Sequence, residues 1–216
     1  MVDRDAATES DEPPGATGPT LVLGWKSGVV IPAGFDDLAS QVVSAVDRLA
    51  TEMFPGRSPA RGEVRVRLVD DHEMREAHLE FMGEDSTTDV ITFDLSEPDA
   101  PESQPDLDGP ELTGSERDGS ESEQGRSVRP GAWDVDLLIC VDEAQRQARA
   151  RGHAVNHELA LYLVHGLLHC LGHDDHDEAS AARMHAVEDE ILVATGLAPV
   201  YASGRSDPVA SRGGAS

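Results

Sequence analysis

The spacing of apolar residues along the chain predicts a mixture of helices and strands. Between Phe35 and Met53 apolar residues recur at steps of three and four, which is the period of a helix with one buried face. The stretch EVRVRLVD alternates instead, as a half-buried strand does, and its polar face carries Arg65 and Arg67. We therefore predict a helix over residues 35–53 and, after a loop, a strand with a basic outer face.

The same signals place the remaining elements. Asp70 or Asp71 is suited to cap a helix that runs to about Met82 and stops at Gly83. VDLLIC is a continuous apolar run, which is typical of a strand buried on both faces. The other predictions are a strand or strand pair over 20–32, a strand over 88–95, and helices over about 142–151, 156–171 and 177–195. Together they predict an α+β fold, a single domain with a small mixed β-sheet packed with about five helices.

Three stretches fall outside this pattern because they are polar and contain almost nothing apolar. We predict that residues 1–19 form a disordered acidic tail and that residues 201–216 form a second disordered tail. Residues 96–130 are predicted to be a disordered acidic insert in a hairpin, because closing a longer loop costs little free energy. The foldable domain then spans residues 20–200.

The formal charge of −25 argues against non-specific nucleic-acid binding, because phosphate contacts need Lys and Arg. It does not exclude an RNA partner, since a local basic patch can lie on an acidic protein, but no DNA partner is expected. Cys140 and Cys170 lie in apolar runs and form no CxxC pair, which argues against a disulfide framework. With no visible secretory segment and no run of membrane-spanning length, we expect a cytoplasmic protein with no membrane partner.

The stretch HGLLHCLGHDDH, from His165 to His176, is dense in metal-binding residue types. His165 and His169 are four apart, so a helix places both imidazoles on one face and can offer them to one metal ion. Gly172 can end the helix and reverse the chain. A third ligand can come from beyond the turn, where the candidates are His173, Asp174, Asp175 and His176. Three protein ligands and an open position are the layout of a catalytic zinc site.

Gly166 bears on the chemistry that such a metal would serve. In the peptidase motif HExxH, the glutamate after the first histidine is the general base. Gly166 has no side chain for this role, and Glu158 lies two turns earlier. A bound zinc still lowers the pKa of its water to about 7 and polarises a phosphoryl oxygen. Phosphodiester cleavage could use these effects directly.

Three blocks of the sequence resemble those of the YbeY family, the endoribonucleases that act as bacterial rRNA maturation factors. The family motif reads roughly HGxLHLxGxDH, where this chain has HGLLHCLGHDDH. The other two blocks are GEDSTTDVITFDL, from Gly83 to Leu95, and DLLICVDEAQRQA, from Asp136 to Ala148. Their order and spacing match apart from the acidic insert, so the resemblance spans about residues 20–200.

The resemblance implies a single-domain α+β metalloprotein that binds one zinc ion per chain through three histidines. Carried onto this sequence, these ligands are His165, His169 and His176, so the zinc site lies on a central helix and the following turn. The resemblance also implies a single-strand-specific endoribonuclease that matures the 3′ end of 16S rRNA and acts in late ribosome quality control. Its implied partners are single-stranded rRNA and the ribosome, as the 30S subunit or the 70S particle.

The chain departs from the family pattern in its third ligand. It has one residue more between Gly172 and His176, so strict register gives the ligand position to Asp175. A carboxylate can bind zinc. We nevertheless favour His176, because a one-residue excess is easily absorbed after a glycine.

Two further departures concern other blocks. Met82 stands where the family often has an arginine thought to assist RNA cleavage. Candidates to position RNA in its place are Arg65 and Arg67, or the loop that carries Arg57 and Arg61. Val135 stands where the family usually has glycine, and a strand accepts valine there.

Two other functions remain open from the sequence. A zinc metallopeptidase follows from the HxxxH pair alone, although the glutamate of HExxH is missing. A non-catalytic, zinc-stabilised ribosome assembly factor is favoured by Met82 and by the negative charge.

Overall fold

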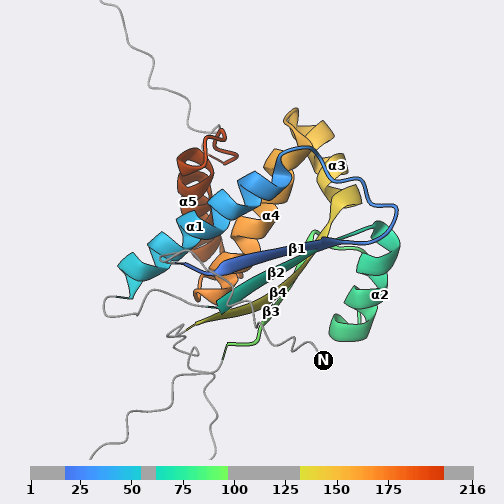
Figure 1. The fold of residues 1–216 in the computed structure, drawn as a ribbon, viewed down its shortest axis with the longest axis horizontal. Helices are drawn as coiled ribbons and strands as arrows, with labels where there is room; N and C mark the ends of the chain where they lie inside the picture. Colours follow the sequence, from blue (N-terminus) through green and yellow to red (C-terminus); the bar gives the residue numbers. More distant parts are fainter. Residues whose placement is uncertain (1–17, 55–61, 97–131, 202–216) are drawn as a thin grey trace, which may run out of the picture.

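The computed structural model describes residues 18–54, 62–96 and 132–201, which form four strands and five helices (Figure 1). In chain order these are β1 (Thr20–Trp25), α1 (Phe35–Met53), β2 (Gly62–Val69), α2 (Asp71–Met82), β3 (Val90–Asp94), β4 (Trp133–Cys140), α3 (Val141–Arg151), α4 (Val155–Cys170) and α5 (Glu178–Ala194). The predicted α+β class with about five helices is confirmed.

The sheet is mixed, with strand order β1-β2-β4-β3. β1, β2 and β4 are parallel, so each pair needs a crossover, and α1 supplies the first one. β3 runs antiparallel to β4 and forms one edge of the sheet. The two strands that flank residues 97–131 are therefore neighbours, as a hairpin requires.

The two faces of the sheet are covered unequally (Figure 1). The main hydrophobic core joins one face to α1, α4 and α5. α2 packs on the opposite face over a smaller cluster that includes Met74 and Ile91. The central helix is α4: between His157 and Cys170 every residue is buried except His165 and His169. The histidine pair thus lies where an otherwise buried helix reaches solvent.

Local signals set the helix ends. The Asp70 side chain accepts a hydrogen bond from the Glu73 N–H at 2.9 Å and caps α2, and Gly83 ends that helix with a φ of 76°. Both predictions are confirmed. Asp177 caps α5 by accepting from the N–H groups of Ala179 and Ser180.

The structure differs from the predictions in two strands. The first strand ends at Trp25, because the chain turns there and the Val29 N–H donates to the Lys26 carbonyl; no second strand follows within residues 26–34. β4 is not buried on both faces along its length, since its buried positions alternate with partly exposed ones until Ile139. Val135 is fully buried within β4, so the strand does accept valine there.

Several predictions fall on residues that the structure does not describe. They are the two tails, the acidic insert and the loop with Arg57 and Arg61, apart from a few end residues. Within the described ranges, no helix is long and apolar enough to cross a membrane.

Candidate metal centre

The histidine pair on α4 forms the centre of the candidate site. One helical turn separates His165 from His169, and their Nε2 atoms lie 3.1 Å apart. The two rings meet edge to face, with centroids 4.6 Å apart. Their side chains are 24% and 35% exposed, so the two nitrogens are accessible from solvent.

The other nitrogen of each ring is held by an acceptor. His165 Nδ1 lies 2.8 Å from Glu188 Oε1, and His169 Nδ1 lies 3.1 Å from the carbonyl oxygen of His173. Because carboxylate and carbonyl oxygens only accept, each Nδ1 carries the proton and donates. The lone pair of each Nε2 is then free for a metal, which is how ligating histidines are oriented in metalloproteins.

Glu188, which orients His165, was not predicted from the sequence. It lies on α5, its side chain has no exposure, and its Oε2 has no hydrogen-bond partner among the described residues. Burial disfavours protonation of His165, but the hydrogen bond and charge of Glu188, together with the charges of Asp89 and Asp175, outweigh burial and raise the His165 pKa. The sequence signal was a carboxylate in the buried stripe of α5, between Met184 and Ile191.

The turn after α4 brings a carboxylate to the pair. Gly172 has a φ of 85°, and the His173 N–H donates back to the Leu168 carbonyl, so the chain reverses as predicted. Asp175 then places Oδ2 at 3.9 Å from His165 Nε2 and Oδ1 at 3.9 Å from His169 Nε2. One ligand atom from each of these three residues lies within 4.8 Å of the others.

His176 lies in a neighbouring group rather than against the pair. Its side chain is 85% exposed, and its Nδ1 lies 2.7 Å from Asp174 Oδ1. Asp174, Asp175 and His176 form a second set of close ligand atoms, linked to the first through Asp175. The structure therefore brings together His165, His169 and Asp175, while His176 as third ligand stays a prediction.

The donor set fits a zinc ion by its chemistry. Two imidazole nitrogens and one carboxylate oxygen are all zinc ligands, and three protein ligands leave a position open. Other divalent ions accept the same donors. Cys170 is not part of the set: burial raises the pKa of its thiol to about 12, and the Sγ–H donates to the Gly166 carbonyl.

Gly166 is required by packing against the sheet. A Cβ at this position would lie 2.5 Å from Leu137 Cδ2 and 2.5 Å from Thr92 Oγ1. The residue therefore faces β3 and β4 at a distance that leaves no room for a side chain. A glutamate, as in the peptidase motif, does not fit between this helix and this sheet.

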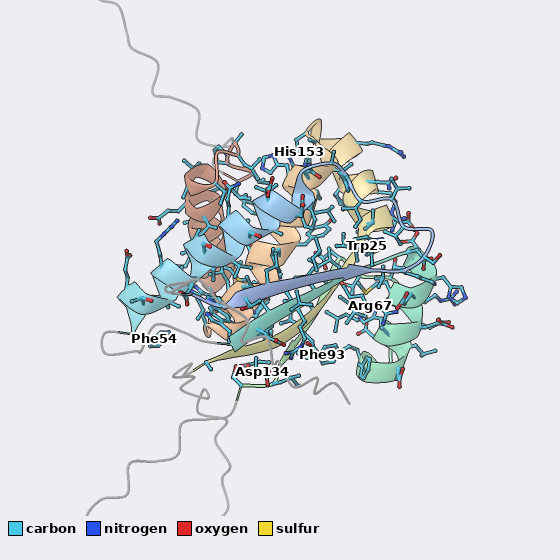
Figure 2. All side chains as sticks on the ribbon, viewed as in Figure 1. Trp25, Phe54, Arg67, Phe93, Asp134 and His153 are labelled. Carbon is cyan, nitrogen blue, oxygen red and sulfur yellow. The ribbon has the colours of Figure 1, made fainter. Side chains whose placement is uncertain are left out.

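Glu158 is committed elsewhere on α4. It is fully buried and accepts hydrogen bonds from Arg151, at 2.7 Å, and from His153. His153 lies at the α3–α4 junction (Figure 2). Glu158 therefore ties two helices together and does not replace the missing glutamate.

The two arginines predicted to position RNA lie on the other face of the sheet. β2 points Val64, Val66 and Leu68 into the main core, so the alternating residues Arg65 and Arg67 point away from α4. Figure 2 labels Arg67. Arg65 is held by Glu63, Asp134 and Asp136, and Arg67 lies 2.5 Å from Glu73. Neither is brought to the histidine pair, and their role in RNA binding stays a prediction.

The position of the family arginine lies at the end of α2. Met82 is 55% exposed, and the preceding Phe81 packs edge to face on Phe93 at 4.8 Å. This corner offers apolar surface where the family pattern offers a guanidinium.

The fold and site define a class: a single α+β domain whose central helix presents a histidine pair beside a carboxylate, in the manner of a metalloprotein. The family model described as "Endoribonuclease YbeY" matches residues 32–196, and the chain belongs to that family.

Individual relatives agree with the family model. Endoribonuclease YbeY from Anaeromyxobacter sp. (strain Fw109-5) is 35% identical over 167 residues, which are 69% of this chain and 72% of that protein. Endoribonuclease YbeY from Macrococcus caseolyticus is 36% identical over 135 residues, covering 62% of this chain and 73% of that one. The solution structure of TM1509 from Thermotoga maritima aligns with a TM-score of 0.46 at 18% identity, over 82% of this chain and 89% of that chain.

Proposed function

We propose that this protein is a metal-dependent endoribonuclease that cleaves single-stranded RNA. The observation that carries the proposal is the histidine pair on α4, with two Nε2 atoms 3.1 Å apart and both facing Asp175. Family membership supplies the substrate class, since the matching relatives are named endoribonucleases.

The metal is proposed to be zinc, one ion per chain. His165 and His169 hold it, with a third ligand from the turn after Gly172. Asp175 faces both histidines in the structure, and His176 is the ligand that the resemblance implies. When bound, zinc supplies a Lewis acid that polarises a phosphoryl oxygen.

The chain's own residues prepare this site. Glu188 fixes the ring of His165, and the His173 carbonyl fixes the ring of His169, so the lone pairs of both Nε2 atoms are left free for a metal. The packing of Gly166 on β3 and β4 holds the helix that carries them. The site is thus preorganised by a buried carboxylate on α5, a backbone carbonyl in the turn after α4, and the packing of α4 on the sheet.

The biological setting follows from the family and rests on no contact in the structure. We propose that the substrate is single-stranded rRNA, in 3′ end maturation of 16S rRNA and in late ribosome quality control. The partners are then the 30S subunit or 70S ribosome, in the cytoplasm.

Two observations favour this function over the alternatives. A metallopeptidase of the HExxH type needs a glutamate at position 166, where a side chain would meet Leu137 and Thr92. A purely structural zinc ion would be closed off from solvent, whereas the side chains of His169 and Asp175 are 35% and 37% exposed.

The proposal is tested by zinc analysis and single-stranded RNA cleavage on wild type, His169→Ala, Asp175→Ala and His176→Ala. His72→Ala is the matched control, because His72 is 75% exposed on α2. We expect His169→Ala to lose zinc and cleavage together while His72→Ala keeps both. Equal cleavage by wild type and His169→Ala would refute the function. Whichever of the other two variants also loses zinc identifies the third ligand.

A further inference from the structure

The outer edge of β3 carries backbone groups that no described residue pairs. The Cys140 N–H donates to the Asp89 carbonyl and the Leu95 N–H donates to the Asp134 carbonyl, both at 2.8 Å. In an antiparallel pair hydrogen-bonded positions alternate, so residues 91 and 93 also bond to β4. Residues 90, 92 and 94 therefore turn their backbone N–H and C=O groups outward.

One of these outward groups is already satisfied. The Val90 N–H donates to the side chain of Asp89 at 2.8 Å. The row that remains is the Val90 carbonyl, the N–H and carbonyl of Thr92, and the N–H and carbonyl of Asp94. It alternates acceptors and donors along the edge of the sheet.

This edge runs alongside the metal helix. Thr92 Oγ1 lies 2.5 Å from where a Cβ of Gly166 would be, and a Val90 methyl lies 3.5 Å from it. Gly166 directly follows His165 in α4. The Thr92 side chain therefore faces α4 next to the residue that follows His165, and the open backbone groups of Thr92 point outward from the sheet edge beside that helix.

Outward backbone groups at this edge could contact RNA where no predicted arginine does, because the arginines predicted to position RNA lie elsewhere. Arg65 and Arg67 are paired with carboxylates on the opposite face, and Met82 replaces the family arginine. A backbone N–H can donate to a phosphate oxygen without a formal charge. In RNA the phosphate acceptors alternate with 2′-hydroxyl groups, which can donate to a carbonyl.

We propose that the outer edge of β3 binds the ribose–phosphate backbone of the substrate strand beside the metal. The Thr92 N–H donates to a phosphate oxygen, and the carbonyls of Val90 and Thr92 accept from 2′-hydroxyls. This inference rests on the proposed endoribonuclease function. It adds a reason why the protein would bind RNA in preference to DNA, because DNA has no 2′-hydroxyl to donate to the edge carbonyls. These hydrogen bonds contact only the ribose–phosphate backbone and no base, so binding at this edge does not depend on the RNA sequence.

The test replaces the amide of Thr92 by an ester, through incorporation of the matching α-hydroxy acid, so that the N–H is lost and the side chain stays. The matched control is the same replacement at Leu23 on β1, the opposite edge of the sheet. The Lys26 N–H donates to the Leu68 carbonyl, so by alternation the Leu23 N–H points away from β2, as the Thr92 N–H points away from β4. A hydrogen bond to a charged group is worth about 1.5–3 kcal/mol, so kcat/KM for single-stranded RNA should fall about ten- to a hundredfold at Thr92. The Leu23 ester should stay within about twofold of wild type. Zinc content should be unchanged in both proteins.

A second measurement uses the wild-type protein, so it does not depend on the ester form folding. Saturating single-stranded RNA should slow hydrogen exchange of the Thr92 and Asp94 amides by about tenfold or more, and the matching DNA should protect them less. Unchanged kcat/KM in a folded Thr92 ester would overturn the binding of RNA at the β3 edge, and so would unchanged exchange at both amides. In either case, RNA cleavage by the wild-type protein would leave the proposed endoribonuclease function standing. Equal protection by DNA, or protection by an extended peptide but not by RNA, would also overturn the proposal.

Discussion

At the scale of single residues, the site depends on side chains that the metal itself would not touch. Glu188 is the clearest case, since it is buried, lies on another helix and holds His165 Nδ1 at 2.8 Å. Partners of this kind fix the tautomer and the ring orientation of a ligand. The sequence motif names the ligands but is silent on what orients them.

Replacing Glu188 should therefore weaken metal binding. We expect Glu188→Ala to lower zinc affinity by about 10–100-fold, and Glu188→Gln by less because the amide oxygen can still accept from Nδ1. The measurement is a competition titration with a zinc chelator. Glu190→Gln, an exposed change on the same helix, is the control and should bind zinc as wild type does. Wild-type affinity in Glu188→Ala would show that the contact has no role in the site.

Replacing Gly166 by alanine should change the free energy of unfolding in the direction opposite to the one that helix propensity predicts. An alanine in a helix interior is ordinarily about 1 kcal/mol better than glycine. Here the added Cβ would meet Leu137 and Thr92 at 2.5 Å, and such overpacking costs about 1–3 kcal/mol. We expect Gly166→Ala to lower the free energy of unfolding in urea, whereas Gly24→Ala, where a Cβ meets nothing within 4 Å, should not. A more stable Gly166→Ala would contradict the close approach of α4 to the sheet.

At the scale of elements, capping and charge fix how helices join the sheet. Asp71, at the start of α2, accepts two hydrogen bonds from Arg146 of α3, at 2.6 and 2.7 Å. The Asp71 N–H in turn donates to Asp142 at 3.0 Å. This joint holds the start of α2 to the first two turns of α3.

The joint should make stability depend on pH in the acid range. Hydrogen bonds from Arg146 hold the Asp71 pKa below its ordinary value, so the carboxylate stabilises the fold above the unfolded-state pKa of about 3.9. That contribution is lost as pH falls through the lower, folded-state pKa. We expect Asp71→Asn to be less stable than wild type at pH 7, with the difference shrinking as pH falls below about 4. Urea unfolding over this pH range measures the difference in free energy of unfolding, and Glu52→Gln, on the exposed surface of α1, is the control. If the difference between Asp71→Asn and wild type persisted unchanged into acid, the charge of Asp71 would be ruled out as its cause.

The elements also show what the sequence could and could not predict. Helix bounds followed from apolar period and caps: α1 agrees with its prediction to the residue, and α2 is capped by Asp70, one of its two candidate caps, and ends at Met82 before Gly83. β4 was predicted to be buried on both faces because its run is apolar, but α2 covers only part of the second face.

We favoured His176 over Asp175 as third ligand, but the sequence does not give the loop geometry after Gly172 on which this choice depends, and the structure turns Asp175 toward the pair. Glu188 could not be predicted either, because it reaches the site only through the packing of α5 on α4.

At the scale of the whole molecule, an acidic chain is proposed to act on an acidic polymer. The two arginines of β2 do not resolve this conflict, since carboxylates hold both on the far face of the sheet. A metal ion, with uncharged backbone donors beside it, would offset the charge repulsion between protein and RNA at the site, without a basic surface. We therefore predict that RNA cleavage depends on the metal far more than on net charge.

Metal removal and return measures this dependence most directly. Protein stripped of metal with a chelator is assayed for single-stranded RNA cleavage before and after zinc is added back in increments. We predict no cleavage by stripped protein and full recovery at one zinc per chain. Cleavage by fully stripped protein at the wild-type rate, or no cleavage after one zinc per chain has bound, would contradict it.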